Sequence, residues 1–368
     1  MVYRAIGLMS GSSLDGLDIV FAEFHENGGK WSYDVKAAAC YAYSDDWNNR
    51  LKDASNLMAY DYLLLHTEYG QYLGSEVNHF IEEFGLQYQV GMVASHGHTV
   101  FHTPGKRMTS QLGDGAGIAA ATELPVITDL RALDVAFGGR GAPIVPIGEK
   151  LLLGDYDFYL NLGGIANIST SATHADGIIG FDVCAANRVL NMLAAEAGKP
   201  FDEDGKLAQS GSVNVKLLEM LNGLDYYRQP FPKSLANEFG TDTVFPIIKK
   251  SECSAGDALR TYCEHIAQQV KQAWEAVEDP GSKAGKKKML VTGGGALNLF
   301  LVKCIRESFS ESNLEIIIPD AFLIRYKEAI IMALIGVLRW REETNVLASV
   351  TGARRNSTGG VLWMGQED

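Results

Sequence analysis

Residues 7–18 read GLMSGSSLDGLD, a stretch whose residue types suit phosphate and metal chemistry better than a core strand or a helix. Glycine N–H groups approach phosphate oxygens closely because no Cβ intervenes, and serine hydroxyls add further donors. Aspartate carboxylates repel phosphate, so their presence here predicts a divalent cation between the carboxylates and the phosphates. For Mg²⁺ such a contact is usually bridged by water. The residues predicted to form this site are Ser10, Gly11, Ser12, Ser13, Asp15 and Asp18.

Two more glycine turns follow apolar stretches later in the chain: Gly163-Gly164 after FYLNL, and residues 293–295 after MLVT. A single glycine turn is most often a plain hairpin connection, since glycine accepts positive φ. Three such turns, each directly after an apolar strand, favour a protein that binds several phosphates. The sequence has no G-x-x-x-x-G-K-[ST], and GDGAG at 113–117 follows the polar MTSQL instead of a strand. The P-loop and dinucleotide-binding patterns are therefore not favoured.

The elements expected to position these turns alternate between strands and helices. Strands over 2–8 and 17–24 flank the first turn, and FYLNLGGIANIST (158–170) repeats the strand–turn–strand pattern as a weak internal echo. Apolar residues at helical spacing predict long helices over 57–86 and 256–277. The fold class is therefore α/β.

Further segments carry the remaining polar side chains of interest. VGMVASHGHTVFH (90–102) predicts a strand that runs into a polar loop, and its three histidines are more typical of such a loop than of a metal site. DGIIGFD (176–182) predicts a strand that ends at Asp182, just ahead of a helix over 186–198. A last helix is expected over 327–341, opened by Glu328 in its first turn.

Composition limits the class of protein. The chain has 368 residues, 46% apolar and 21% charged, which is enough to bury a sizeable core. Its net charge of −13 argues against nucleic acid and anionic membranes as partners. The odd number of cysteines, five, without C-x-x-C spacing fits a reducing compartment. No secretory or membrane-spanning pattern is evident, so we expect a soluble cytoplasmic protein.

The combined motifs resemble a known superfamily. Two strand–turn–strand phosphate clamps followed by a late G-G-G turn look like the acetate and sugar kinase, heat-shock chaperone and actin superfamily. Within it, the sequence is similar to the anhydro-N-acetylmuramic acid kinases. The matching segments, in that family's order, are GLMSGSSLDGLD (7–18), HGHTVFHTPG (96–105), DLRALD (129–134), GGRGAPIVP (138–146), NLGGIANIS (161–169), GFD (180–182), FDEDGKLAQSG (201–211), PKS (232–234), VTGGGALN (291–298) and VTGARR (350–355).

The resemblance implies a fold and an activity. The expected fold is a two-lobed actin-like ATPase (ribonuclease H-like) with a nucleotide cleft between the lobes. Residues 1–128 plus 346–368 are expected to form the N-terminal lobe, and residues 129–345 the C-terminal lobe. The expected reaction, in the cytoplasm and in cell-wall recycling, uses ATP, Mg²⁺ and water. It opens 1,6-anhydro-N-acetylmuramic acid and phosphorylates O6, giving N-acetylmuramic acid 6-phosphate. A homodimer is also carried over from the family.

The same resemblance implies roles for individual residues. Asp182 is the candidate catalytic base, although an aspartate before a helix is also a common N-cap. An arginine at position 131 could meet the lactyl carboxylate of the sugar through a bidentate fork, or else pair with a neighbouring aspartate. The residues expected to bind ATP are Ser10, Gly11, Ser12, Ser13, Asp15, Asp18, Gly163, Gly164, Asn167, Gly293, Gly294, Gly295 and Asn298, with Asp15 and Asp18 facing Mg²⁺ through water. Those expected to bind the sugar are His96, Thr99, Arg131, Asp134, Asn187 and Glu328.

One segment departs from the family pattern directly after the candidate base. Where the family reads GFDTGPGN, this chain reads GFDVCAAN (180–187). Turn positions that needed positive φ would be strained by Cys184 or Ala186, so the loop is expected to take another path, with the helix starting earlier. Cys184 has no evident partner and is interpreted as a packing residue. The departure leaves two alternatives open: a kinase of the same fold for a different sugar, or a nucleotide-dependent switch without a small substrate.

Overall fold

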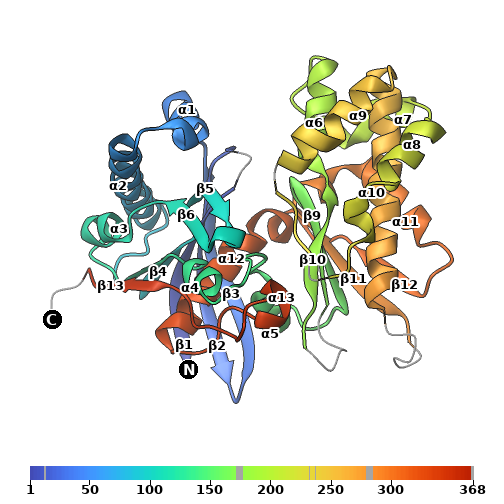
Figure 1. Cartoon of the computed structure of the whole chain (residues 1–368). Coiled ribbons are helices and arrows are strands. Elements are labelled where there is room, and N and C mark those ends of the chain that lie inside the picture. Colours follow the sequence, from blue (N-terminus) through green and yellow to red (C-terminus); the bar gives the residue numbers. More distant parts are fainter. Residues whose placement is uncertain (12–13, 171–176, 232, 237, 279–284, 366–368) are drawn as a thin grey trace. The chain divides into compact units, whose positions relative to one another are not determined.

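The computed structural model describes residues 1–11, 14–170, 177–231, 233–236, 238–278 and 285–365. The chain divides into two compact units (Figure 1). Unit 1 comprises Met1–Gly154 and Tyr326–Asp368, and unit 2 comprises Asp155–Arg325. Residues 129–154 and 326–345 thus lie with the N-terminal unit, whereas the sequence analysis assigned them to the C-terminal lobe.

Unit 1 is built on a six-stranded sheet with the strand order β13-β7-β4-β1-β2-β3 (Figure 1). Its strands are β1 (Val2–Ser10), β2 (Leu17–Asn27), β3 (Lys30–Tyr41), β4 (Met92–Ser95), β7 (Val126–Thr128) and β13 (Val361–Trp363). The first three form an antiparallel meander, and β4 and β7 continue the sheet parallel to β1. A separate hairpin pairs β5 (His98–Thr103) with β6 (Met108–Leu112). Residues 98–102 are therefore a strand and not the predicted polar loop.

The helices of unit 1 are α1 (Asp45–Asp53), α2 (Ala59–Glu83), α3 (Gly115–Thr122), α4 (Ala132–Ala136), α5 (Pro146–Leu152) and α13 (Ala348–Thr351), together with the part of α12 (Ala321–Trp340) from Tyr326 onward. The predicted helix over 57–86 is confirmed as α2, which buries Tyr69, Leu73 and Phe80. A Cβ on Gly7 of β1 would overlap the carbonyl of Ala329 in α12, so helix and strand backbones touch directly. This close contact explains why residues 326–345 belong to unit 1.

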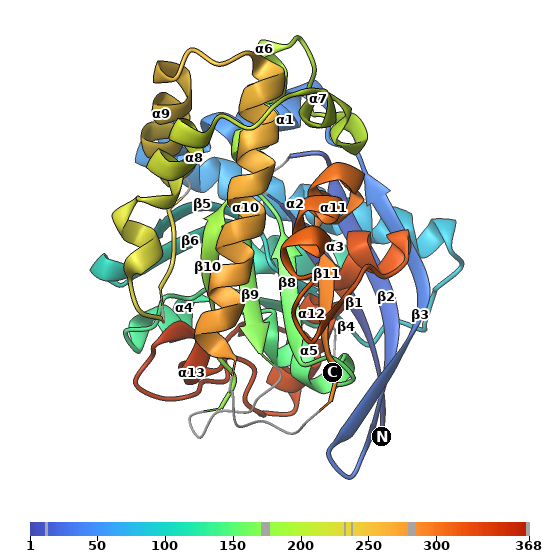
Figure 2. The ribbon, with the colours of Figure 1, turned by 90° about the vertical axis from the view of Figure 1, so that its right-hand side faces the viewer.

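Unit 2 is built on a five-stranded sheet with the order β10-β9-β8-β11-β12. Its strands are β8 (Phe158–Leu162), β9 (Ile165–Thr170), β10 (Gly180–Ala185), β11 (Lys287–Thr292) and β12 (Leu314–Ile317). Its helices are α6 (Asn187–Glu196), α7 (Lys206–Ser210), α8 (Val215–Asn222), α9 (Phe245–Lys250), α10 (Ala255–Val277) and α11 (Leu299–Ser308). Figure 2 shows α10 and α11 lying across one face of the sheet. Leu160, Leu162 and Val291 point into that core.

Both units repeat one strand plan. In each, three antiparallel strands are followed by two strands parallel to the first: β1-β2-β3 with β4 and β7, and β8-β9-β10 with β11 and β12. The turn at Gly11 and the turn at Gly163-Gly164 occupy the same position in this plan. The internal echo seen in the sequence therefore reflects two similar units, and the predicted α/β, two-lobed fold class is confirmed. Among the described residues, no helix combines the length and apolar character that crossing a bilayer requires.

Candidate active site

The first glycine turn joins β1 to β2 in unit 1. Ser10 ends β1, and Asp18 lies opposite Met9 near the start of β2. Asp15 is exposed and Asp18 half-buried, while Ser12 and Ser13 lie outside the described residues. Mg²⁺ prefers one or two carboxylates, with water and substrate phosphates completing its shell. The two carboxylates beside this turn fit that demand.

The side chain of Ser10 lies in a buried hydrogen-bond chain. Tyr43 donates its hydroxyl to Ser10 Oγ (2.8 Å) and also contacts the hydroxyl of Tyr69 (2.6 Å). Ser10 Oγ lies 3.2 Å from His98 Nδ1. Burial lowers the pKa of His98 to about 4, so the ring is neutral near pH 7 and Nδ1 can accept the serine proton. Ser10 therefore anchors the turn through its side chain, and no sequence motif marked Tyr43 or Tyr69 as its partners.

His96 and Arg131, both predicted to bind the sugar, lie in direct contact. His96 Nδ1 is 2.8 Å from the carbonyl of Gly97 and must donate to it. Nε2 therefore accepts from Arg131 Nε at 2.9 Å, which requires a neutral ring. Burial lowers the pKa of His96 to about 3, in agreement with this assignment. Arg131 also donates to the carbonyl of Gly141 (2.5 Å), so the guanidinium is held from two sides.

Asp134 helps to hold the contact between His96 and Arg131 in place. It is fully buried, and its two oxygens accept from Thr351 Oγ1 (2.7 Å) and from the N–H of Gly141 (2.8 Å). The carboxylate therefore fixes the loop whose carbonyl holds Arg131, and this geometry favours a structural role over the predicted contact with the sugar. Thr99 is exposed on β5, where Gln111 reaches its hydroxyl at 3.4 Å.

Glu328 lies in the middle of α12, because this helix begins at Ala321 and not at Lys327. The interpretation of Glu328 as a first-turn acid is therefore wrong. Its neighbour Lys327 is buried and forms a 2.7 Å ion pair with Glu149 of α5. This pair fixes the helix turn that carries Glu328, which is half-buried.

In unit 2 the two remaining glycine turns lie side by side. The residues after β10 donate to the first of them: Ala186 N–H to the carbonyl of Gly164 (2.8 Å), and Asn187 N–H to that of Gly163 (3.0 Å). A Cβ on Gly295 would lie 2.8 Å from Asn187 Oδ1 and 2.7 Å from Leu162 Cβ. The structure thus brings the predicted phosphate-binding glycines of both turns together with Asn187.

Asn298 has a local role at the end of the triple-glycine turn. Its side-chain oxygen accepts from the N–H of Leu301 (3.0 Å) and caps α11. The same oxygen would meet a Cβ placed on Gly205, which has a φ of +71°. Asn298 therefore positions the turn, whereas the sequence analysis assigned it to ATP directly.

A row of polar residues crosses the sheet of unit 2. Thr292, Asn161, Asn167 and Asp182 are direct partners on β11, β8, β9 and β10. Partners in register share a face of the sheet, and this face is opposite to the one that packs on α10. Thr292 Oγ1 is buried and has no hydrogen-bond partner among the described residues. Asn161 and Thr292 were missed, although Asn161 interrupts the apolar strand FYLNL and Thr292 ends the apolar run MLVT.

The carboxylate of Asp182 is held by a neighbouring segment. Leu235 donates its N–H to Asp182 Oδ2 (2.8 Å), and Asp182 N–H donates to the carbonyl of Lys233 (3.2 Å). Tyr226 donates its hydroxyl to the carbonyl of Asp182 (2.6 Å). The residue that precedes α6 is Ala186, and no side chain caps this helix. The interpretation of Asp182 as a helix cap is therefore wrong.

The departure from the family pattern at 183–186 is accommodated within the strand. The strand β10 continues to Ala185, with a register shift between Asp182 and Cys184 that leaves Val183 as the extra residue. None of residues 183–186 has positive φ, so the segment avoids the strain that positive φ would impose on Cys184 or Ala186. The helix α6 begins at Asn187, one residue after the predicted start at 186, so the expectation of an earlier helix start is wrong. Cys184 is fully buried, and burial raises the pKa of its thiol, as expected for a packing residue.

The histidines of β5 are not arranged as a metal centre. Within the described ranges, no group of three or more His, Cys, Asp or Glu side chains is placed to hold a metal ion. His102 Nδ1 instead lies 3.0 Å from the hydroxyl of Thr109.

Three buried histidines predict a pH dependence of stability. Burial lowers the pKa of His96, His98 and His265 to about 3, 4 and 3, from the ordinary 6.5. Below pH 6.5 the unfolded chain binds more protons than the folded one, so stability is full above that pH and is lost as pH falls through the folded values. Each fully titrating histidine contributes about 1.4 kcal/mol per pH unit to this loss.

Urea unfolding at several pH values between 4 and 7 measures the effect. His265→Gln is expected to make the decline of unfolding free energy less steep. The exposed His25 is the control, and His25→Gln should leave the slope unchanged. Equal slopes for the wild type and His265→Gln would contradict burial of a neutral His265.

Comparisons with known proteins bear on this arrangement. The family model described as "Anhydro-N-acetylmuramic acid kinase" matches residues 3–365. A relative of that name from Sulfurovum sp. is 33% identical, over 97% of this chain and 98% of its own length. Another from Methylobacterium nodulans is 31% identical, over 97% and 99%. Among solved structures, a ROK family glucokinase from Streptomyces griseus, in complex with glucose and AMPPNP, is similar at a TM-score of 0.41 and 12% identity, covering 90% of this chain and 98% of that one.

Proposed function

The chain belongs to the family of anhydro-N-acetylmuramic acid kinases, and on that premise we propose that Asp182 activates the water that opens the sugar while ATP phosphorylates O6. The substrate is 1,6-anhydro-N-acetylmuramic acid, and the product is N-acetylmuramic acid 6-phosphate. This reaction would serve cell-wall recycling. The proposal concerns the ring opening and the residues that perform it.

The bond changes require only one acid–base group. Water attacks C1 and gives its proton to a carboxylate base, while the C1–O6 bond breaks. The γ-phosphorus of ATP takes up O6, and ADP leaves. Ordinary glycoside hydrolysis needs a second carboxyl group to protonate the leaving oxygen. Capture by the phosphoryl group makes that second acid unnecessary here.

The observation that carries the proposal is the fixed carboxylate of Asp182. The Leu235 N–H holds Oδ2 at 2.8 Å, and main-chain bonds fix the residue on both sides. A base held in one orientation loses little entropy when it takes the water proton. Asp182 also ends a row of polar side chains on one sheet face, while its neighbours Phe181 and Val183 are buried in the core.

We propose that the glycine turns of both units bind the phosphates of ATP. In unit 1 the binding residues are Gly11 and the serines around it. In unit 2 they are Gly163, Gly164 and the turn at 293–295. Asp15 and Asp18 are proposed to hold Mg²⁺ through its water shell. When bound, the ion would neutralise charge on the transferred phosphoryl group. Asn167 and Asn298 would position the turns of unit 2.

Sugar recognition is proposed for Arg131, Thr99, Asn187 and Glu328, with His96 positioning the guanidinium of Arg131. The guanidinium of Arg131 is pre-oriented by His96 and Gly141, which suits a planar carboxylate such as the lactyl group. Residues held by their neighbours lose less entropy when a ligand binds.

Replacing Arg131 with lysine tests this recognition. Lysine keeps the charge and loses the fork and the bond to His96. We expect the KM for the sugar to rise about tenfold or more, with the KM for ATP unchanged. Arg107→Lys, at an exposed position of the same unit, is the control and should have wild-type constants. An unchanged sugar KM for Arg131→Lys would remove Arg131 from the site.

The choice of sugar is tested by a panel of sugars with ADP release as the readout. We expect turnover of 1,6-anhydro-N-acetylmuramic acid and little of glucose or N-acetylglucosamine. Turnover of another sugar, without turnover of 1,6-anhydro-N-acetylmuramic acid, would favour a kinase of different specificity. The altered residues 183–186 raise this possibility. ATP-driven change without turnover of any sugar would favour a switch protein. A homodimer and a cytoplasmic location complete the proposal, and light scattering of the purified protein checks the former.

A further inference from the structure

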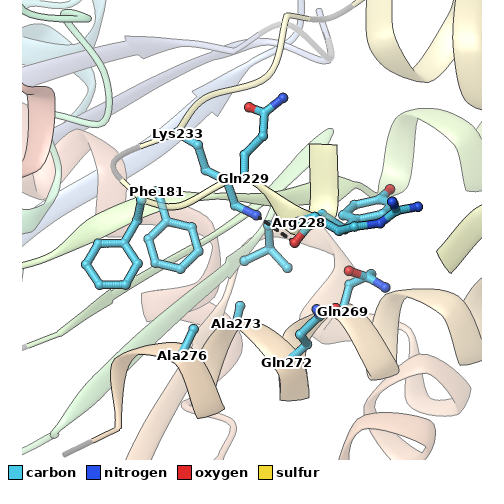
Figure 3. Close-up of a pocket in the computed structure, with 11 residues that line it drawn as sticks. Phe181, Arg228, Gln229, Lys233, Gln269, Gln272, Ala273 and Ala276 are labelled. Carbon is cyan, nitrogen blue, oxygen red and sulfur yellow. Dashed lines mark hydrogen bonds between the residues drawn. The ribbon is translucent and has the colours of Figure 1, made fainter. Parts of the chain in front are cut away.

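A pocket of about 240 Å³ lies in unit 2, on the helix side of the sheet (Figure 3). Its floor comes from β10 and α10, and its rim from the segment before Lys233. Neighbouring strand residues alternate between faces, so Asp182 lies on the other side of β10 from this pocket. The lining side chains are Phe181, Val183, Tyr227, Arg228, Gln229, Phe231, Lys233, Gln269, Gln272, Ala273 and Ala276.

Lys233 brings a positive charge into this pocket. Its Nζ donates to the carbonyls of Tyr226 (3.3 Å) and Tyr227 (3.4 Å), both long bonds. Among the described residues, no carboxylate lies within 4.0 Å of it. The Phe181 and Tyr226 rings lie 5.7 and 4.7 Å from the ammonium, and burial lowers its pKa. Two weak bonds leave a half-buried ammonium poorly compensated, and an anion would satisfy it.

The other walls suit a compact polar molecule with a flat apolar face. The rings of Phe181 and Phe231 stack at 5.4 Å with an interplanar angle of 7°, and Phe231 is 37% exposed. The amides of Gln229, Gln269 and Gln272 can exchange hydrogen bonds with hydroxyl groups. The volume equals that of about eight water molecules in the liquid, which is the scale of a monosaccharide.

We propose that this pocket binds a sugar-sized organic anion, a carboxylate or phosphate monoester, and that its occupancy lowers turnover. The anion pairs with Lys233, its hydroxyl groups meet the glutamines, and its apolar face rests on Phe231. Arg228 at the rim, whose partner Asp225 is exposed, adds a second positive charge.

Three main-chain and hydroxyl contacts connect this pocket to Asp182. Lys233 accepts the N–H of Asp182 through its carbonyl, and Leu235 donates to Oδ2. Tyr226, whose carbonyl Lys233 contacts, donates its hydroxyl to the carbonyl of Asp182. An anion that draws the ammonium away from Tyr226 and Tyr227 shifts the chain that orients the carboxylate. This coupling rests on the proposed role of Asp182 as the base, whereas the binding site does not.

Binding is tested by methyl NMR on the whole chain without ATP or substrate, using glucuronate, glucose 6-phosphate and neutral glucose as probes. Both anions are expected to shift the methyl signals of Val183, Ala273 and Ala276, and glucose is not. Lys233→Met should weaken the shifts about tenfold or more, and the exposed Lys216→Met should not. Shifts with only one anion would restrict the site to carboxylates or to phosphates. No shift with either, equal shifts with glucose, or full binding by Lys233→Met would overturn the site.

The coupling between the pocket and Asp182 is tested by measuring turnover of the anhydro sugar at a saturating concentration of the anion. Ala276→Trp fills the pocket from α10 and leaves no room for the anion, so it should lose most of the inhibition. Its neighbour Glu275 does not line the pocket, and Glu275→Trp should keep both the basal rate and the inhibition. Methyl shifts without any change in turnover would overturn the coupling. If the protein turns over no anhydro sugar, the proposed function fails, while the NMR result still decides the site.

Discussion

Asp182→Asn is expected to lower turnover of the anhydro sugar by about 10³-fold, with ATP affinity close to that of the wild type. General-base catalysis contributes about 10²–10⁴-fold to a rate, and an amide cannot accept the water proton. Asparagine keeps the size of the side chain, and its oxygen can still accept the Leu235 N–H. The measurement is kcat from ADP release, together with the dissociation constant of a non-hydrolysable ATP analogue.

A matched control distinguishes the loss of the catalytic base from a general effect of removing a carboxylate in unit 2. Asp242 is exposed and bonds to the adjacent Thr241, and Asp242→Asn should turn over normally. Turnover of Asp182→Asn within about tenfold of the wild type would contradict the assignment of the base. If the variant loses both ATP binding and turnover, Asp182 is instead needed to maintain the fold of unit 2.

Gly293→Ala is expected to give a large loss of stability, about 3 kcal/mol or more. Gly293 has a φ of +80°, and a Cβ there would lie 2.6 Å from Asn161 Oδ1 and 2.8 Å from the main chain of Leu162. With a φ of +80° and a ψ of 164°, Gly293 lies in a region of backbone conformation that is essentially restricted to glycine. An alanine there costs about 1–3 kcal/mol, and the overlap with backbone adds more. Urea unfolding measures the change, and the turn should also lose affinity for ATP.

Two other glycines divide this effect into its causes. Gly198 has a φ of +74° with no atom near a built Cβ, so Gly198→Ala should show the cost of φ alone. Gly164 lacks positive φ, and its nearest neighbour to a built Cβ is 3.9 Å away. Gly164→Ala should therefore fold normally, and a weaker ATP affinity would report contact with phosphate. Unchanged stability in Gly293→Ala would contradict the packing of the turn against β8.

Local signals in the sequence were enough to predict the fold class and the positions of the glycine turns. Apolar strands ending in glycine are visible along the chain, and their repetition matches the common plan of the two units. The end of β10 was not visible in this way. A β-bulge at Val183 carries the strand past Asp182, and only pairing with β9 specifies it.

The partners that fix the site residues also lay beyond the sequence signal. The sequence predicts Asp134 in DLRALD as a sugar ligand, but its two oxygens accept from Thr351, which is 217 residues away, and from the nearby Gly141. Ser10 likewise meets Tyr43 and His98 through tertiary packing. Residue type and spacing indicate which groups can react; which of them are already occupied depends on contacts between distant segments.

The most direct test of the central claim is turnover of 1,6-anhydro-N-acetylmuramic acid in H₂¹⁸O, with the label located by mass spectrometry. The product should be quenched early and compared with unlabelled product kept in the same water, to correct for exchange at C1. Attack by water on C1 predicts one ¹⁸O at C1 and none in the phosphate. Label in the phosphate, or an unlabelled product that keeps its anhydro bridge, would contradict the account.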